Sequence, residues 1–250
     1  MHTLTLTHVQ LDELRLKLHG AMEVAWLWVA CDARTKLIPA FAQGPRTQAV
    51  AHQLVHDIGH RLAPGCVPVF SSDGLALYFY ALTAHFGAWA QTLGERRRRW
   101  TVNAQVLYAQ VIKRYRRRRI AEVRHQVQLG TPEAYRLALC ALGFSGRIQT
   151  AFIERLNLTL RRSIAGLARQ SWSTAHSLSE LALHFEWWRA VYHFTRPHAS
   201  LRQLINDNST GSARPRYRPR TPAQAAGLVA RRWSVQQLLT YPAPPLPSAG

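Results

Sequence analysis

Three carboxylates in this chain have the residue types and positions that metal-dependent chemistry needs. Asp12 and Asp73 each end a predicted strand, and Glu154 opens an amphipathic helix, one position off its apolar stripe. Carboxylates that converge from separate elements offer the oxygen ligands that Mg²⁺ or Mn²⁺ prefers. Two such ions, about 3.5–4 Å apart, can activate a nucleophile and stabilise the leaving oxygen of a displacement at phosphorus.

Each of these acids also has an ordinary structural explanation. An Asp after a strand commonly stabilises a turn, and Glu154 could simply interact with the helix dipole. Asp32 also follows an apolar run, and we interpret Asp-x-x-Thr as the turn of a hairpin. Glu13 adjoins Asp12 but should point to the opposite face of a strand, so only one of the two can be the first acid of the group. Spacing alone leaves these interpretations open.

The net charge of the chain indicates a polyanionic partner. Its 250 residues include 32 Lys and Arg against 13 Asp and Glu, a formal charge of +19, which favours nucleic acid. Part of this charge lies in two arginine runs, whose contacts to phosphate would be independent of DNA sequence. The candidate DNA contacts in these runs are Arg97, Arg98, Arg116, Arg117, Arg118 and Arg119.

Several other classes of protein do not fit. No Gly-rich phosphate loop and no G-x-S-x-G elbow occur, so we expect neither ATP-driven nor serine-hydrolase chemistry, and no small-molecule substrate. The 3 cysteines are far apart, which argues against disulfides and a thiolate zinc site. The 12 histidines are scattered, and His184 and His198 show no partner spacing, so we assign the histidines no metal role. Without a signal peptide or an apolar span, we expect a cytoplasmic protein with no membrane contact.

The hydrophobic pattern predicts the elements that must hold the acids. Strands are expected at 3–14, 25–31, 36–43 and 67–70, and helices at 47–62 and 75–87. This order, β-β-β-α-β-α, is characteristic of an α/β ribonuclease-H-like (retroviral-integrase-like) fold, a mixed sheet flanked by helices.

The remainder of the chain is predicted to add an insertion, further helices and a tail to that core. Residues 89–130 are interpreted as a basic insertion that contains a hairpin of 106–115 and 120–129. Helices are expected at 132–142, 151–169 and 177–194. The catalytic domain would then cover 1–205, followed by a flexible Pro- and Arg-rich tail, 206–250, with a short helix at 222–230.

A series of short motifs occurs in a recognisable order. They are VQLDE at 9–13, WLWVACDARTKLIPAF at 26–41 with GPRT at 44–47, FSSDG at 70–74, FIERLNLTLR at 152–161, YHF at 192–194 with RPH at 196–198, and TPA at 221–223. Together they resemble the DDE class of insertion-sequence transposases, and in particular the insertion-sequence-one type, over roughly residues 9–239.

The resemblance implies a ribonuclease-H-like core that cleaves DNA at element ends and joins the exposed 3′ hydroxyl to target DNA. Asp12, Asp73 and Glu154 would be the catalytic, metal-binding triad for Mg²⁺ or Mn²⁺, two ions in number. Asp12 is chosen over Asp32 because the family's first acid lies on the first strand. Arg161 and Arg162 would lie near the DNA end, with Asn157 in a supporting position on the same helix.

The same resemblance implies the partners and the location. They are DNA, at element ends and target, and further copies of the chain in a homodimer or higher oligomer, because two ends must be joined. The expected location is the bacterial cytoplasm, in association with the nucleoid.

Two departures from the family pattern shape the alternatives. The interval from Asp73 to Glu154 is longer than in retroviral integrases, and the basic insertion would fill it. The first strand begins almost at Met1, which predicts an N-terminally truncated copy without an end-recognition module. The alternatives are a non-catalytic basic nucleic-acid-binding remnant of a transposase, and a ribonuclease-H-like nuclease of another kind.

Overall fold

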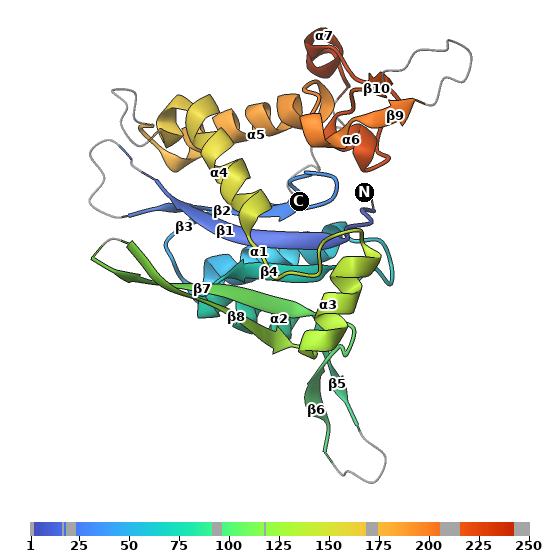
Figure 1. Ribbon diagram of the computed structural model, residues 1–250. Coiled ribbons are helices and arrows are strands. Elements are labelled where there is room, and N and C mark those ends of the chain that lie inside the picture. The colour runs from blue at the N-terminus through green and yellow to red at the C-terminus, as the bar shows by residue number, and fades with distance from the viewer. Residues whose placement is uncertain are drawn as a thin grey trace. The chain divides into compact units, whose positions relative to one another are not determined.

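The computed structural model describes residues 3–16, 18, 24–91, 97–117, 119–168, 175–205 and 216–242. Its contacts divide the chain into two units, Met1–Leu183 and His184–Gly250, which we describe separately. The first unit is a mixed α/β structure with a sheet between helices, and it holds all the candidate acids (Figure 1).

A six-stranded mixed sheet forms the centre of the first unit. In sheet order, its strands are β3 (Phe41–Gly44), β2 (Trp26–Asp32), β1 (His8–Arg15), β4 (Val69–Asp73), β7 (Tyr108–Arg116) and β8 (Arg119–Leu129). β1, β4 and β7 are parallel neighbours, whereas β2, β3 and β8 pair antiparallel. The carboxyl ends of β1, β4 and β7 therefore meet at one end of the sheet.

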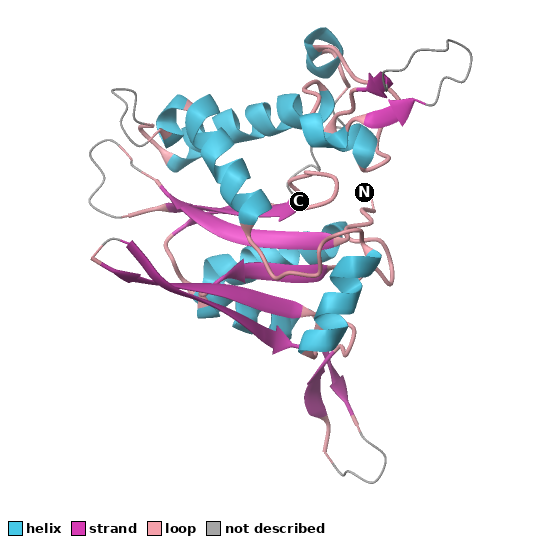
Figure 2. Ribbon diagram, in the orientation of Figure 1, coloured by secondary structure: helices cyan, strands magenta, loops and turns pink. Residues whose placement is uncertain are grey.

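Helices cover both faces of this sheet (Figure 2). One face carries α1 (Gln48–Arg61) and α2 (Ala76–His85), and the other carries α3 (Pro132–Ala141), α4 (Ala151–Ser163) and the 3₁₀ turn η1 (Ala165–Leu167). The apolar side chains between the layers are fully buried, among them Leu11, Leu27, Leu54, Ile58 and Leu82. This arrangement is compatible with the expected ribonuclease-H-like one.

The largest correction concerns the predicted insertion at 89–130. β7 pairs parallel with β4 from Phe70 to Asp73, so residues 108–129 belong to the central sheet. The start of β7 is buried and apolar, whereas its distal half and much of β8 are exposed and basic. Because the arginines of this exposed part dominate the composition, the sequence of the whole segment indicated a surface insertion. The smaller hairpin of β5 (Gly87–Ala90) and β6 (Arg99–Val102) does form a sheet of its own.

Some predicted boundaries are also wrong. The first strand begins at His8 instead of Thr3 and continues to Arg15, so Asp12 lies within it and does not end it as predicted. The third strand begins only at Phe41, after a turn at Lys36 with a left-handed φ of 62°. The helix expected over 151–169 ends as an α-helix at Ser163.

The second unit has small elements of its own. They are the end of α5 (Leu178–Phe194), η2 (Ala199–Leu201), β9 (Gln203–Ile205), β10 (Arg216–Arg218), α6 (Pro222–Ala225) and α7 (Val235–Leu239). The Trp233 ring lies 4.9 Å from Phe194 and 5.0 Å from Tyr241, which ties α5 to the C-terminal helices. The predicted tail is therefore structured over 216–242, and its predicted helix at 222–230 ends at Ala225.

Within the described part of the chain, we find no helix that combines the length and the apolar character needed to cross a bilayer.

Asp32 stabilises the turn between β2 and β3, as its spacing predicted. Its fully buried carboxylate accepts hydrogen bonds from the backbone N–H and hydroxyl of Thr7, the N–H of His8, and the N–H and hydroxyl of Thr35, at 2.7–3.1 Å. Both oxygens are thus committed to backbone and hydroxyl donors that hold the turn against the start of β1.

We predict that Asp32→Ala lowers the free energy of unfolding by about 3 kcal/mol or more, because it leaves buried N–H donors without an acceptor. Denaturant unfolding measures the loss. Asp57→Ala on α1 is the matched control, and an equal loss in both variants would contradict this structural role.

Candidate functional site

The parallel pairing of β1 with β4 brings two of the predicted acids together. The two strands are paired only from His8 to Leu11 of β1, so Asp12 lies just beyond the paired segment and Asp73 is the last residue of β4. Ligand oxygens of Asp12, Glu13 and Asp73 all lie within 4.8 Å of one another. Oxygen donors at this spacing suit a hard divalent cation.

Glu13 is the member of this group that we did not predict. As expected for a strand, Asp12 contacts α4 and Glu13 contacts the opposite layer, where the Tyr78 hydroxyl donates to it at 3.0 Å and Arg46 forms an ion pair with it. β4 is not paired with this part of β1, so side chains from both faces approach Asp73 around the open strand end. The signal available in the sequence was the Asp-Glu pair at a strand end.

Glu154 reaches the same pocket from α4. Its side chain is 46% exposed, accepts a hydrogen bond from the Thr150 hydroxyl at 2.7 Å and pairs with the Lys113 ammonium at 2.5 Å. A pocket of about 510 Å³ is lined by Asp12, Asp73 and Glu154 together with Lys113. The three predicted acids therefore share one cavity, although Glu154 lies outside the compact group of Asp12, Glu13 and Asp73.

The position of Glu154 depends on a buried glutamine in β1. The Gln10 side-chain oxygen accepts from the backbone N–H groups of Phe152 and Ile153 at 3.1 and 3.0 Å, and its amide donates to the Gln149 carbonyl at 2.8 Å. Thr150, the N-cap residue, makes no capping bond to the backbone. Gln10 therefore satisfies N–H groups that an N-cap side chain would normally satisfy, and it does so two residues before Asp12.

Asn157 and two arginines lie on the other side of the acids. Asn157, one turn after Glu154, donates from its side-chain amide to Asp12 at 2.6 Å. A second pocket of about 500 Å³ is lined by Asp12, Glu154, Asn157, Arg161 and Arg162. The structure thus brings the three predicted α4 side chains to the same cavity as two of the acids.

The predicted arginine runs separate into two places. Arg116, Arg117 and Arg119 are exposed at the tip of the β7–β8 hairpin, on the strand whose Lys113 lines the acidic pocket. Arg118 lies outside the described residues.

Arg97 and Arg98 are exposed immediately before β6, whose hairpin with β5 projects from the opposite end of the sheet (Figure 1). The structure therefore does not bring this second pair to the acids.

Burial of several carboxylates close together controls their ionisation. Burial, followed by the charges of Asp73 and Glu13, raises the pKa of Asp12 to about 7. Burial also raises the pKa values of Glu13 and Asp73, against the opposing effect of Arg46. The site disfavours its own negative charge, and a bound divalent cation would relieve this repulsion. The donor set and its electrostatics therefore fit Mg²⁺ or Mn²⁺.

Comparison with known proteins adds no assignment. No model of a known protein family matches the chain, and no curated protein matches it significantly.

The raised pKa of Asp12 predicts an unusual dependence of stability on pH. The folded protein holds this proton up to about pH 7, whereas the unfolded chain releases it near pH 4, so stability falls as pH rises between the two values. We expect a loss on the order of a few kcal/mol, since one pKa unit corresponds to about 1.4 kcal/mol. Denaturant unfolding with a chelator present, from pH 4 to 8, measures it.

Asp12→Asn is the control, because the amide cannot ionise. The variant should lose less stability over this pH range than the original chain, and Mg²⁺ at pH 8 should stabilise the original chain more. Identical pH profiles would disprove the assignment to Asp12.

We further predict that Gln10→Ala lowers the free energy of unfolding by about 2 kcal/mol or more, because the N–H groups of Phe152 and Ile153 lose their acceptor. Gln48→Ala is the control, since Gln48 makes a single hydrogen bond to the Leu77 carbonyl. Proteolysis at the start of α4 should accelerate in Gln10→Ala only; unchanged protection there would refute the capping role.

Proposed function

We propose that this chain is a DDE-type transposase catalytic core, which cleaves DNA with Mg²⁺ or Mn²⁺ and transfers the cut strand to target DNA. The observation that carries the proposal is the convergence of Asp12, Asp73 and Glu154 on one pocket of a protein with a formal charge of +19. A buried acidic centre on a basic protein suits a substrate that carries both phosphate and bound cations.

The sheet order supports the ribonuclease-H-like assignment within this proposal. β3, β2 and β1 are three successive antiparallel strands, β1 pairs parallel with β4, and β4 pairs parallel with β7. The first two acids lie just beyond the segment where β1 pairs with β4 and at the last residue of β4. Motif order along the sequence and the position of α4 beside β1 are consistent with the same family.

The metal ions, two in the proposal, would be held by Asp12, Asp73 and Glu154, with Glu13 beside them. When bound, they would activate the attacking oxygen and stabilise the leaving one. The chain's own residues prepare this site. Asn157 holds one oxygen of Asp12, and Gln10 holds the start of α4 against β1. Cation binding at Glu154 would compete with its Lys113 ion pair and leave that ammonium to face a DNA phosphate.

DNA is the proposed partner, as element ends and as target. Arg161 and Arg162 line the second pocket beside the acids, and the arginines of the β7–β8 tip extend from the strand that carries Lys113. These positions favour one DNA path that passes α4 and the β7–β8 hairpin, with strong salt dependence. Joining two ends requires at least a homodimer.

One observation favours a second candidate function. Glu154 is paired with Lys113 and stands apart from the compact acidic group, as it could in a basic nucleic-acid-binding protein without catalysis. A ribonuclease-H-like nuclease that cleaves without joining would use the same acids as a transposase.

We predict that Asp73→Asn reduces nicking of supercoiled DNA in Mg²⁺ or Mn²⁺ by more than the roughly 10–100-fold typical of an outer-shell substitution. DNA binding in a gel-shift assay, and its salt dependence, should stay unchanged. Asp57→Asn is the matched control. Equal nicking by Asp73→Asn and the original chain, or binding without any nicking, would reject the catalytic proposal.

A separate substrate distinguishes transposase from nuclease. A duplex with a pre-cleaved 3′ hydroxyl, mixed with plasmid and Mg²⁺, should yield covalently joined product if the chain performs strand transfer. Plasmid cleavage without joined product would instead identify a nuclease of another kind.

A further inference from the structure

Four histidines gather on the surface that α1 and α2 form, away from the acidic pocket. His52, His56 and His60 recur every four residues along α1, so they lie on one face of that helix, and His85 is the last residue of α2. In the sequence the histidines are scattered and were assigned no metal role; His85 becomes a neighbour of the α1 histidines only because α1 packs against α2.

Two of the ring separations, both involving His85, match those that a shared metal ion would need. The His85 ring centre lies 5.3 Å from that of His52 and 5.5 Å from that of His56, and the His56 and His60 ring centres are 4.2 Å apart. Zn–N bonds are about 2.0–2.1 Å long, so two imidazoles at a tetrahedral angle on one ion have ring centres about 5 Å apart. His85 meets this condition with both His52 and His56.

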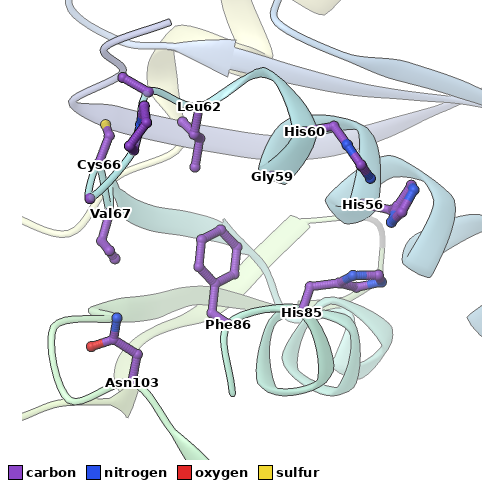
Figure 3. Close-up of a pocket in the computed structure, with 12 residues that line it drawn as sticks. His56, Gly59, His60, Leu62, Cys66, Val67, His85, Phe86 and Asn103 are labelled. Carbon is purple, nitrogen blue, oxygen red and sulfur yellow. The ribbon is translucent and has the colours of Figure 1, made fainter. Parts of the chain in front are cut away.

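The surroundings leave room for an ion and for ring rotation. His56, His60 and His85 are exposed and His52 is half-buried. Figure 3 shows His56, His60 and His85 on the same side of a pocket of about 520 Å³, with His85 approaching from the other helix. Among the described residues, only Asp12, Glu13 and Asp73 place three ligand atoms within 4.8 Å of one another. The histidine side chains would therefore rotate to bring their ring nitrogens to one ion.

The protonation state of His85 agrees with a ligand role. Partial burial of the ring, and then the nearby His52, His56 and His60, lower the pKa of His85. The neutral imidazole is the form that binds a metal ion.

We propose that His52, His56 and His85 form a second metal site, which binds a transition-metal ion such as Zn²⁺ and links α1 to the end of α2. The donor chemistry separates it from the acidic pocket, since imidazole suits Zn²⁺ whereas carboxylate oxygens suit Mg²⁺. This inference does not depend on the proposed DNA chemistry. It assigns the ion a structural role on the helical layer that also supplies Tyr78 to Glu13.

Calorimetric titration with Zn²⁺ tests the proposal on the full chain without a histidine tag. Saturating Mg²⁺ and an Asp73→Asn background keep Zn²⁺ from the acidic pocket. We expect one Zn²⁺ per chain, at least tenfold weaker binding in His85→Ala, and unchanged binding in His184→Ala, the exposed control on α5. No Zn²⁺ binding, or equal affinity in His85→Ala and its parent, would overturn the proposal.

Two further measurements guard against a folding defect. Zn²⁺ should raise the melting temperature of the parent but not that of His85→Ala or the double variant His52→Ala/His56→Ala. Without metal, these variants should melt close to the parent, since the replaced side chains lie on the outer face of the helices. A Zn²⁺-dependent rise that persists in both variants would place the ion elsewhere.

Discussion

The acidic site depends on how one glutamine side chain joins a helix to a strand. Gln10 is fully buried in β1 and bonds to the first backbone groups of α4, far away in sequence. Because a buried helix end without partners costs free energy, this contact fixes both the position and the direction of α4. Asp12 follows two residues later in β1, and Glu154 and Asn157 follow within the first two turns of α4, so a single anchor aligns both sides of the pocket.

The same pocket shows a conflict between stability and charge. Several carboxylates lie where the pairing of β1 with β4 ends, and burial with mutual repulsion raises the pKa values of Asp12, Glu13 and Asp73. The chain partly offsets this repulsion through Arg46 and Lys113, which approach from a loop and from β7. Such destabilising clusters are common at functional sites, where the ligand supplies the missing charge.

Some of this structure could be predicted from residues alone. The alternation of strands with amphipathic helices identified the mixed α/β class, and the Asp-x-x-Thr spacing identified the turn at Asp32. The β7–β8 segment was misjudged because its buried start is short and its exposed arginines dominate the composition. Glu13 was not chosen because the alternation of side chains along β1 assigns it to the face opposite Asp12. That rule does not say where the neighbouring strand β4 ends, and the end of β4 lets Glu13 approach Asp73.

Sequence by itself determined the positive charge, the elements near the acids and the local roles of side chains within a few residues of one another. Only the tertiary structure decided which distant groups meet: Gln10 with the start of α4, Lys113 with Glu154, and His85 with the histidines of α1. The physical reason is that local periodicity records which face of an element is buried. The pairing of one element with another follows from strand register and helix packing across the whole core.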